Sequence, residues 1–287
     1  MAYREHPPSP RWRGLAECLW TSAAPAVPEI VDVLPDGCMD LVWSGAELFV
    51  AGPDTAPHPF TRVPGIAVTG LRFHPGVLPA LLGAPAAALR DARVPLDALH
   101  PVLARRARAA LETGVAPAAV LAALAARLPG GSPEPGLRAA AAWLSRGASA
   151  AQTADALGWS TRTLHRHSLA AFGYGPAMLR RVLRFRRAVT LLDAGHAPAD
   201  VAARAGYADQ PHLSREVRAL GGASPARVMA AASGPARPVE GGPFDTGPVN
   251  AGPPETAPPE SGPPRAQPAG SVANRSTPVP SGSWTIA

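Results

Sequence analysis

The sequence has no lysine, only two cysteines and no long apolar run, and each shortage excludes a class of protein. Cys18 and Cys38 are too few for a disulfide framework or for a four-cysteine zinc site. No apolar stretch could span a bilayer, and the first residues lack the apolar core of a secretion signal. We therefore expect a soluble, cytoplasmic protein with no membrane partner.

All 27 basic residues are arginine, and they are distributed unevenly along the chain. Residues 137–233 hold 13 arginines against 5 acidic residues, a net charge of +8. Residues 1–136 hold 11 against 12, and residues 234–287 hold 3 against 4. A positive excess confined to one segment is typical of a nucleic-acid-binding domain.

The arginine-rich segment contains one pattern twice, over residues 149–166 and 198–215. Each copy has a short helix, a turn in which an aromatic residue follows glycine, and a second helix. Gly158 and Gly206 stand where a helix end favours a left-handed residue, and Ser149 with a glutamine three places later fits a capping box. Two helices joined in this way form a helix-turn-helix, whose second helix can lie in the DNA major groove.

Further helices are predicted around these two copies. Ser160 and Asp209 are good N-caps for the second helix of each copy, and Ser224-Pro225 opens a last short helix. A longer helix is predicted from Pro176 to Asp193, between the copies. Its apolar face carries Leu179, Val182, Leu183, Val189 and Leu192, and its other face carries Arg180, Arg181, Arg184 and Arg187.

The N-terminal part reads as β-structure followed by helices. Short apolar runs between residues 12 and 73 predict strands at 29–34, 38–43, 47–51 and 66–73, with hairpin turns at Pro35–Gly37 and Ser44–Gly45. We expect a cupin-like barrel or a sandwich. Helices follow at Leu78–Leu82, Leu99–Leu111 and Pro117–Leu128, and their Ala-Leu stripes pack either inside the domain or against a second copy of it.

The predicted fold is therefore α+β, with two domains. Residues 1–128 form a β-rich domain, 129–136 a linker and 137–233 an all-α domain with two helix-turn-helix units. The tail, 234–287, holds 13 of the 36 prolines and few large apolar residues, so we expect it to be disordered.

Two further motifs follow the helix-turn-helix units, Gly173-Tyr-Gly-Pro176 and Gly222-Ala-Ser-Pro225. With them, residues 137–232 resemble the AraC/XylS-type transcriptional regulators. Residues 12–100 are similar to the sensor domain of a less-studied branch of these regulators, through the runs 34–43, 51–54 and 70–73. The resemblance implies a regulator, not an enzyme, that binds double-stranded DNA. It also implies a small-molecule effector at the N-terminal domain, contact with RNA polymerase and a homodimer, and it requires no cofactor.

The resemblance also indicates which side chains carry DNA recognition. With Leu164 and Leu213 pointing inward, the outward DNA-binding candidates are Arg162, His165, Arg166, Gln210, His212, Ser214 and Arg215. Family positions favour Arg162, Arg166, Gln210 and Arg215 as base readers, although Arg166 and Arg215 could instead form structural ion pairs. Arg180, Arg181 and Arg187 are candidates for phosphate contacts, or form a solvated face.

One departure from the family pattern is visible in the core of the first unit. Many relatives have phenylalanine where this chain has Ser168, so Leu169 and Phe172 are expected to fill the first unit's core. The family pattern also places Arg184 inward.

Two reading helices on one linking helix should enter successive major grooves about 34 Å apart.

The alternative is a small-molecule-binding or metal-dependent barrel enzyme with accessory DNA binding. It would use His58, His74 and Cys38, but the two histidines precede prolines in predicted turns, and no His-x-His spacing occurs in the N-terminal domain. No Ser-His-Asp or paired-carboxylate arrangement is present either, so no catalytic or metal-binding residue is predicted.

Overall fold

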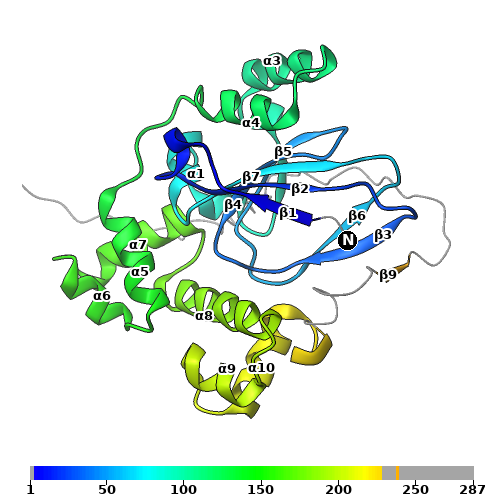
Figure 1. Cartoon of the computed structure of the whole chain (residues 1–287). Coiled ribbons are helices and arrows are strands. Elements are labelled where there is room, and N and C mark those ends of the chain that lie inside the picture. Colours follow the sequence, from blue (N-terminus) through cyan, green and yellow to red (C-terminus); the bar gives the residue numbers. More distant parts are fainter. Residues whose placement is uncertain (1–2, 228–236, 239–287) are drawn as a thin grey trace, which may run out of the picture. The chain divides into compact units, whose positions relative to one another are not determined.

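The computed structural model describes residues 3–227 and 237–238, in which a β-rich domain precedes a helical region (Figure 1). The larger antiparallel sheet has the order β1-β2-β7-β4-β5-β8. Its strands are β1 (Tyr3–His6), β2 (Ala16–Ser22), β4 (Met39–Trp43), β5 (Leu48–Ala51), β7 (Val68–Phe73) and β8 (Arg93–Pro95). The smaller sheet consists of β6 (His58–Arg62), β3 (Glu29–Val33) and β9 (Arg237–Pro238), in that order.

All four predicted strands are present, but one predicted hairpin is wrong. The turn at Ser44–Gly45 does join β4 to β5, and these strands pair. The turn at Pro35–Gly37 instead carries the chain from the smaller sheet to the larger one, because β3 pairs with β6 and β9, and β4 pairs with β7. Strand β4 is almost fully buried and suits the inside of the larger sheet, whereas β3 is largely exposed and suits the smaller sheet.

Helices cover the larger sheet and share its core. They are α1 (Val77–Leu82), α2 (Leu96–Leu99), α3 (Pro101–Glu112) and α4 (Pro117–Ala125). Leu121 and Leu124 of α4 belong to one core cluster with Leu41 and Phe73 of the sheet. The helix predicted over 99–111 is present as α3 but begins at Pro101, because this proline disfavours helical geometry at His100, which separates α2 from α3.

The helical region contains α5 (Pro135–Ser145), α6 (Ala150–Ala156), α7 (Thr161–Phe172), α8 (Pro176–Asp193), α9 (Pro198–Ala205) and α10 (Gln210–Gly221). Helix α8 has the predicted bounds, and α5 begins two residues inside the predicted linker. A further helical turn begins at Pro225, as predicted. The tail predicted as disordered lies outside the described residues, apart from β9.

Helix α8 connects α7 to α9 (Figure 1) and contributes side chains to two hydrophobic cores. Its first half packs Leu179 and Val182 with Phe172 of α7. Its second half packs Phe185 and Leu192 against α9 and α10. Because one continuous helix contributes to both cores, the spacing of the two units is set by that helix.

Helix α8 also contacts the β-rich domain. Both terminal nitrogens of Arg186 donate to the carboxylate of Glu17 in β2, at 3.0 and 2.5 Å, and one lies 3.3 Å from the Cys38 sulfur. Burial would raise the pKa of Glu17, but hydrogen bonds from His74 and Arg186 lower it to about 2. Gly37 has a φ of +83°, and a Cβ there would come within 3.2 Å of Leu183. Close packing here therefore favours glycine.

Candidate nucleic-acid interface

The first helix-turn-helix unit consists of α6, a turn and α7. The Ser149 capping box is present, with Gln152 N–H donating to the Ser149 hydroxyl at 3.2 Å and the Gln152 side chain accepting from Ser149 N–H at 2.9 Å. Gly158 adopts a φ of +65° at the turn, and the Ser160 hydroxyl accepts from the backbone N–H of Thr163 at 3.1 Å. These local bonds fix the start of α7 as predicted.

The second unit repeats this construction with α9 and α10. Gly206 has a φ of +78° at the end of α9, and an Asp209 carboxylate oxygen accepts from the backbone N–H of His212 at 2.6 Å. Leu213 is fully buried, as is Leu164 at the corresponding place in the first unit. The inward leucines fix which side chains of each second helix face away from the core.

The strongest base-reading candidates are exposed side chains. Arg162 and Arg166 on α7 and Gln210 and Arg215 on α10 are all exposed. Within residues 3–227 and 237–238, no ion pair involves Arg166 or Arg215, although a structural ion pair was the alternative considered for them. Their guanidinium groups are therefore available to a ligand.

The other candidates are divided between exposed and locally engaged side chains. His165 is exposed, whereas Ser214 is half-buried. His212 is half-buried too, since its Nδ1 accepts from Ala208 N–H at 3.3 Å and its ring lies edge-on to Tyr207. His212 therefore supports the turn before α10, and base reading by it remains a prediction.

The arginines of α8 differ in the same way. Arg187 is exposed, and Arg180 donates to the carbonyl of Gly147 at 3.5 Å. Arg181 donates to Glu216 of α10 at 2.7 Å, so part of its charge is already compensated within the protein. Phosphate contacts by these three arginines remain predictions.

Arg184 lies inward, consistent with the position that the resemblance implied. Its guanidinium carbon is 4.4 Å from the centre of the Tyr207 ring, and it approaches Glu216 at 3.6 Å. Burial raises the pKa of Tyr207, an effect that the charge of Arg184 opposes. Arg184 therefore ties α8 to the second unit.

The core of the first unit is filled partly as predicted. Phe172 is buried with Leu137, Leu144 and Leu179. Leu169 remains half-buried and belongs to no core cluster among the described residues, so its expected role is wrong. Ser168 is fully buried, and its hydroxyl has no hydrogen-bond partner in the described part of the chain.

The two histidines considered for a metal site lie in the β-rich domain and not in the helix-turn-helix units. His58 opens strand β6 and does not lie in a turn as predicted, and burial lowers its pKa. His74 approaches Glu17 at 3.5 Å. In the described residues, no group of three or more His, Cys, Asp or Glu could hold a metal ion. No described helix is long and apolar enough to cross a membrane.

Two parts of the chain match the models of known protein families. Residues 4–95 match a domain of unknown function, DUF6597, and residues 153–231 match a helix-turn-helix domain. Nothing among the curated proteins matches the chain.

Among solved structures, an AraC-type transcriptional regulator from Chromobacterium violaceum is similar at 25% identity and a TM-score of 0.32, covering 33% of this chain and 90% of that one. The C-terminal domain of AraT, a response regulator from Geobacillus stearothermophilus, is similar at 21% identity and a TM-score of 0.32, covering 37% and 89%. ToxT from Vibrio cholerae is similar at 10% identity and a TM-score of 0.42, covering 80% and 99%.

Proposed function

The chain is a DNA-binding transcription regulator with an AraC-type helix-turn-helix domain, and we propose that it binds a two-part promoter site through α7 and α10. The observation that carries this proposal is the sharing of α8 between two helix-turn-helix cores. A single rigid linking helix favours the insertion of both reading helices into successive major grooves on one side of the duplex. The site of action would be the cytoplasm, and contact with RNA polymerase is proposed from the family resemblance.

Selection of bound sequences from a random duplex pool tests this function. We expect a consensus of two short motifs whose centres are about one helical turn, roughly 10 base pairs, apart. Binding of the selected duplex should weaken steeply with salt, because arginine–phosphate contacts release counterions. Equal affinity for selected and random duplexes at physiological salt would contradict the proposal.

We also propose that the β-rich domain senses a small-molecule effector and has no catalytic role. The support is the contact between this domain and α8, where Arg186 meets Glu17 and Leu183 meets Gly37. Any change at β2 or at the turn before β4 therefore acts directly on the helix that carries both reading units. The effector would then alter DNA affinity through the position of α8.

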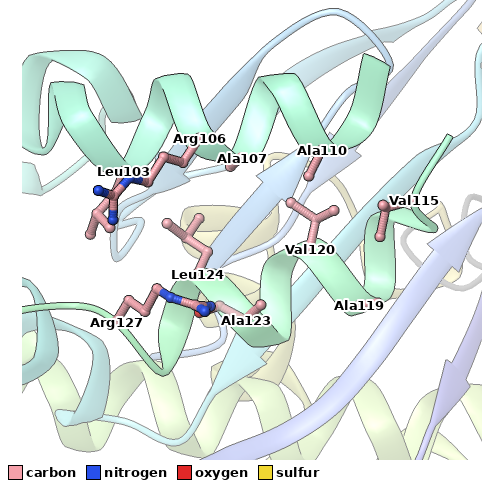
Figure 2. Close-up of a pocket in the computed structure, with 10 residues that line it drawn as sticks. All are labelled: Leu103, Arg106, Ala107, Ala110, Val115, Ala119, Val120, Ala123, Leu124 and Arg127. Carbon is pink, nitrogen blue, oxygen red and sulfur yellow. The ribbon is translucent and has the colours of Figure 1, made fainter. Parts of the chain in front are cut away.

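The second copy of a homodimer is proposed to bind the groove between α3 and α4 (Figure 2). Leu103, Ala107 and Ala110 of α3 face Val120 and Leu124 of α4 across a cavity of about 310 Å³. Val115, which also lines this groove, is 44% exposed. A groove with an apolar floor, an exposed valine and two arginines, Arg106 and Arg127, suits burial against another protein surface.

Replacing Ala119 with glutamate, at an exposed position that lines this groove, should shift the protein from dimer to monomer. A longer, charged side chain at the interface opposes association, because its carboxylate would have to be desolvated. The measurement is analytical ultracentrifugation of the full chain. Ala109→Glu is the matched control, because Ala109 is exposed on α3 outside the groove and should leave the assembly unchanged. Dimers of equal stability in both variants would place the interface elsewhere.

A further inference from the structure

The two sheets of the β-rich domain enclose a cavity of about 240 Å³. The larger sheet contributes residues of β2, β4, β5 and β7 to its wall, and the smaller sheet contributes residues of β3 and β6. The cavity is smaller than the roughly 300 Å³ at which pockets for drug-sized ligands begin. A ligand that fits it is therefore a compact molecule with one ring or two fused rings.

Aromatic side chains form much of the wall, namely Tyr3, Trp20, Phe49 and Phe60. The rings of Tyr3 and Trp20 lie 5.8 Å apart. Two contacts hold Trp20 in place, because its indole N–H donates to Asp40 at 2.7 Å and the same edge of its ring lies over Gly70. A Cβ at Gly70 would come within 2.2 Å of that ring, so only glycine allows this position. The wall is thus built to keep an aromatic surface in place.

Three arginines also line the cavity, and each already has a carboxylate partner. Arg62 pairs with Glu29, and Arg93 pairs with Asp54 through two bonds of 2.9 and 2.7 Å. Arg72 is surrounded by three carboxylates, those of Glu5, Asp36 and Asp40, at 3.3 to 3.4 Å. An anionic ligand would have to compete with these internal partners.

Of the charged residues that line the cavity, three are these arginines and one is Asp40, and carboxylates are in local excess only around Arg72. The carboxylates around Arg72 outnumber the guanidinium group, and only Asp40 among them faces the cavity. Burial raises the pKa of Asp40, an effect that Arg72 opposes. A buried carboxylate whose ionised form is poorly solvated gains from a further positive charge nearby. Aromatic faces attract cations as well.

We propose that this cavity binds a small ligand in which a flat apolar ring carries a protonated amine. The amine lies against Asp40, and the ring lies among Trp20, Phe49 and Phe60. Two observations carry the inference: the aromatic wall held by Gly70, and the excess of carboxylates around Arg72. The inference rests on the proposed function only where it identifies this ligand as the effector of the regulator.

Calorimetric titration of the full chain with a matched probe series tests the charge preference. The probes are 2-phenylethylamine, 2-phenylethanol and 3-phenylpropionate, which share a phenyl ring and differ in charge. We expect the amine to bind at least about tenfold more tightly than the alcohol, and the carboxylate to bind most weakly. Tightest binding of the carboxylate, equal binding of all three, or no binding of the amine would overturn the proposal.

Two variants locate the site. Asp40→Asn keeps an acceptor for Trp20 and should remove the advantage of the amine over the alcohol, whereas the control Asp32→Asn, at an exposed position of β3, should retain it. Asp40→Asn also removes a partner of Arg72 and could unfold the domain, so Val33→Trp provides the second test. Val33 is 37% exposed and lines the cavity, so tryptophan there should block all three probes while the melting temperature is maintained. Undiminished binding to folded Val33→Trp would overturn the proposed location.

Binding to the selected duplex is measured separately, without any probe. A chain that binds the duplex but not the amine retains its regulatory function and overturns only the ligand assignment. A chain that binds the amine but not the duplex leaves the ligand assignment standing and contradicts the DNA-binding proposal. The two failures are therefore distinguishable.

Discussion

Replacing Arg215 with alanine is expected to weaken binding to the selected duplex by about 1–3 kcal/mol, the usual value of one good base contact. This corresponds to roughly a five- to 150-fold loss of affinity. The side chain is exposed on α10, and no ion pair holds it within the described residues. Its loss therefore leaves no buried partner uncompensated, and the change in affinity reports the DNA contact itself. Fluorescence anisotropy with labelled duplex at fixed salt measures it.

Arg218→Ala is the matched control, since Arg218 is an exposed arginine in the last turn of the same helix. Both variants lose one positive charge, but reading side chains lie near the N-terminal end of a recognition helix. Arg218→Ala should therefore weaken selected and random duplexes about equally. Arg215→Ala should also relax the preference at one half of the consensus, and Arg166→Ala at the other half. An identical effect of Arg215→Ala and Arg218→Ala would show that Arg215 reads no base.

The helical region could be predicted closely because its signals are local. The Ser149 capping box, the Ser160 and Asp209 N-caps and the Gly206 turn each depend on residues within four positions of one another. Helix α8 has the predicted bounds for the same reason, with Pro176 in its first turn. The position of the buried leucine in each unit then determines which side chains of the second helix face outward.

The β-rich domain was predicted less well because strand pairing is non-local. Apolar runs located β4 and β7, but nothing in the sequence near Pro35 shows that the chain changes sheets there. The contact between Arg186 and Glu17 joins residues 169 positions apart, and no local pattern singles out Arg186 among its neighbouring arginines. The carboxylates around Arg72 likewise come from separate strands and turns.

Phe185 is a buried residue of α8 that the prediction left out. It was not among the residues assigned to the buried face, yet it is fully buried. Phe185 lies four residues before Val189 and seven before Leu192, so the helical period places it on that same face. The local pattern of the sequence therefore contained this signal.

Phe185→Ala is expected to destabilise the second helix-turn-helix unit by about 3–5 kcal/mol, through lost apolar burial and the cavity left behind. Phe185 belongs to the core that joins α8 to α9 and α10, whereas the first unit has a separate core around Phe172. Hydrogen exchange should therefore show lost protection in α9 and α10 and retained protection in α6 and α7. Footprinting should show contact with only the half-site read by α7.

Leu191→Ala is the control for Phe185→Ala, because Leu191 lies on the same helix and is only partly buried against the same core. Its loss leaves a smaller cavity, so the destabilisation should stay below about 2 kcal/mol. Protection and the footprint should then match those of the unchanged protein. If Phe185→Ala instead removed protection from α6, α7, α9 and α10 together, the two cores would unfold as one. The reading helices would then be a single cooperative unit, and no variant of the second core could leave a half-site bound.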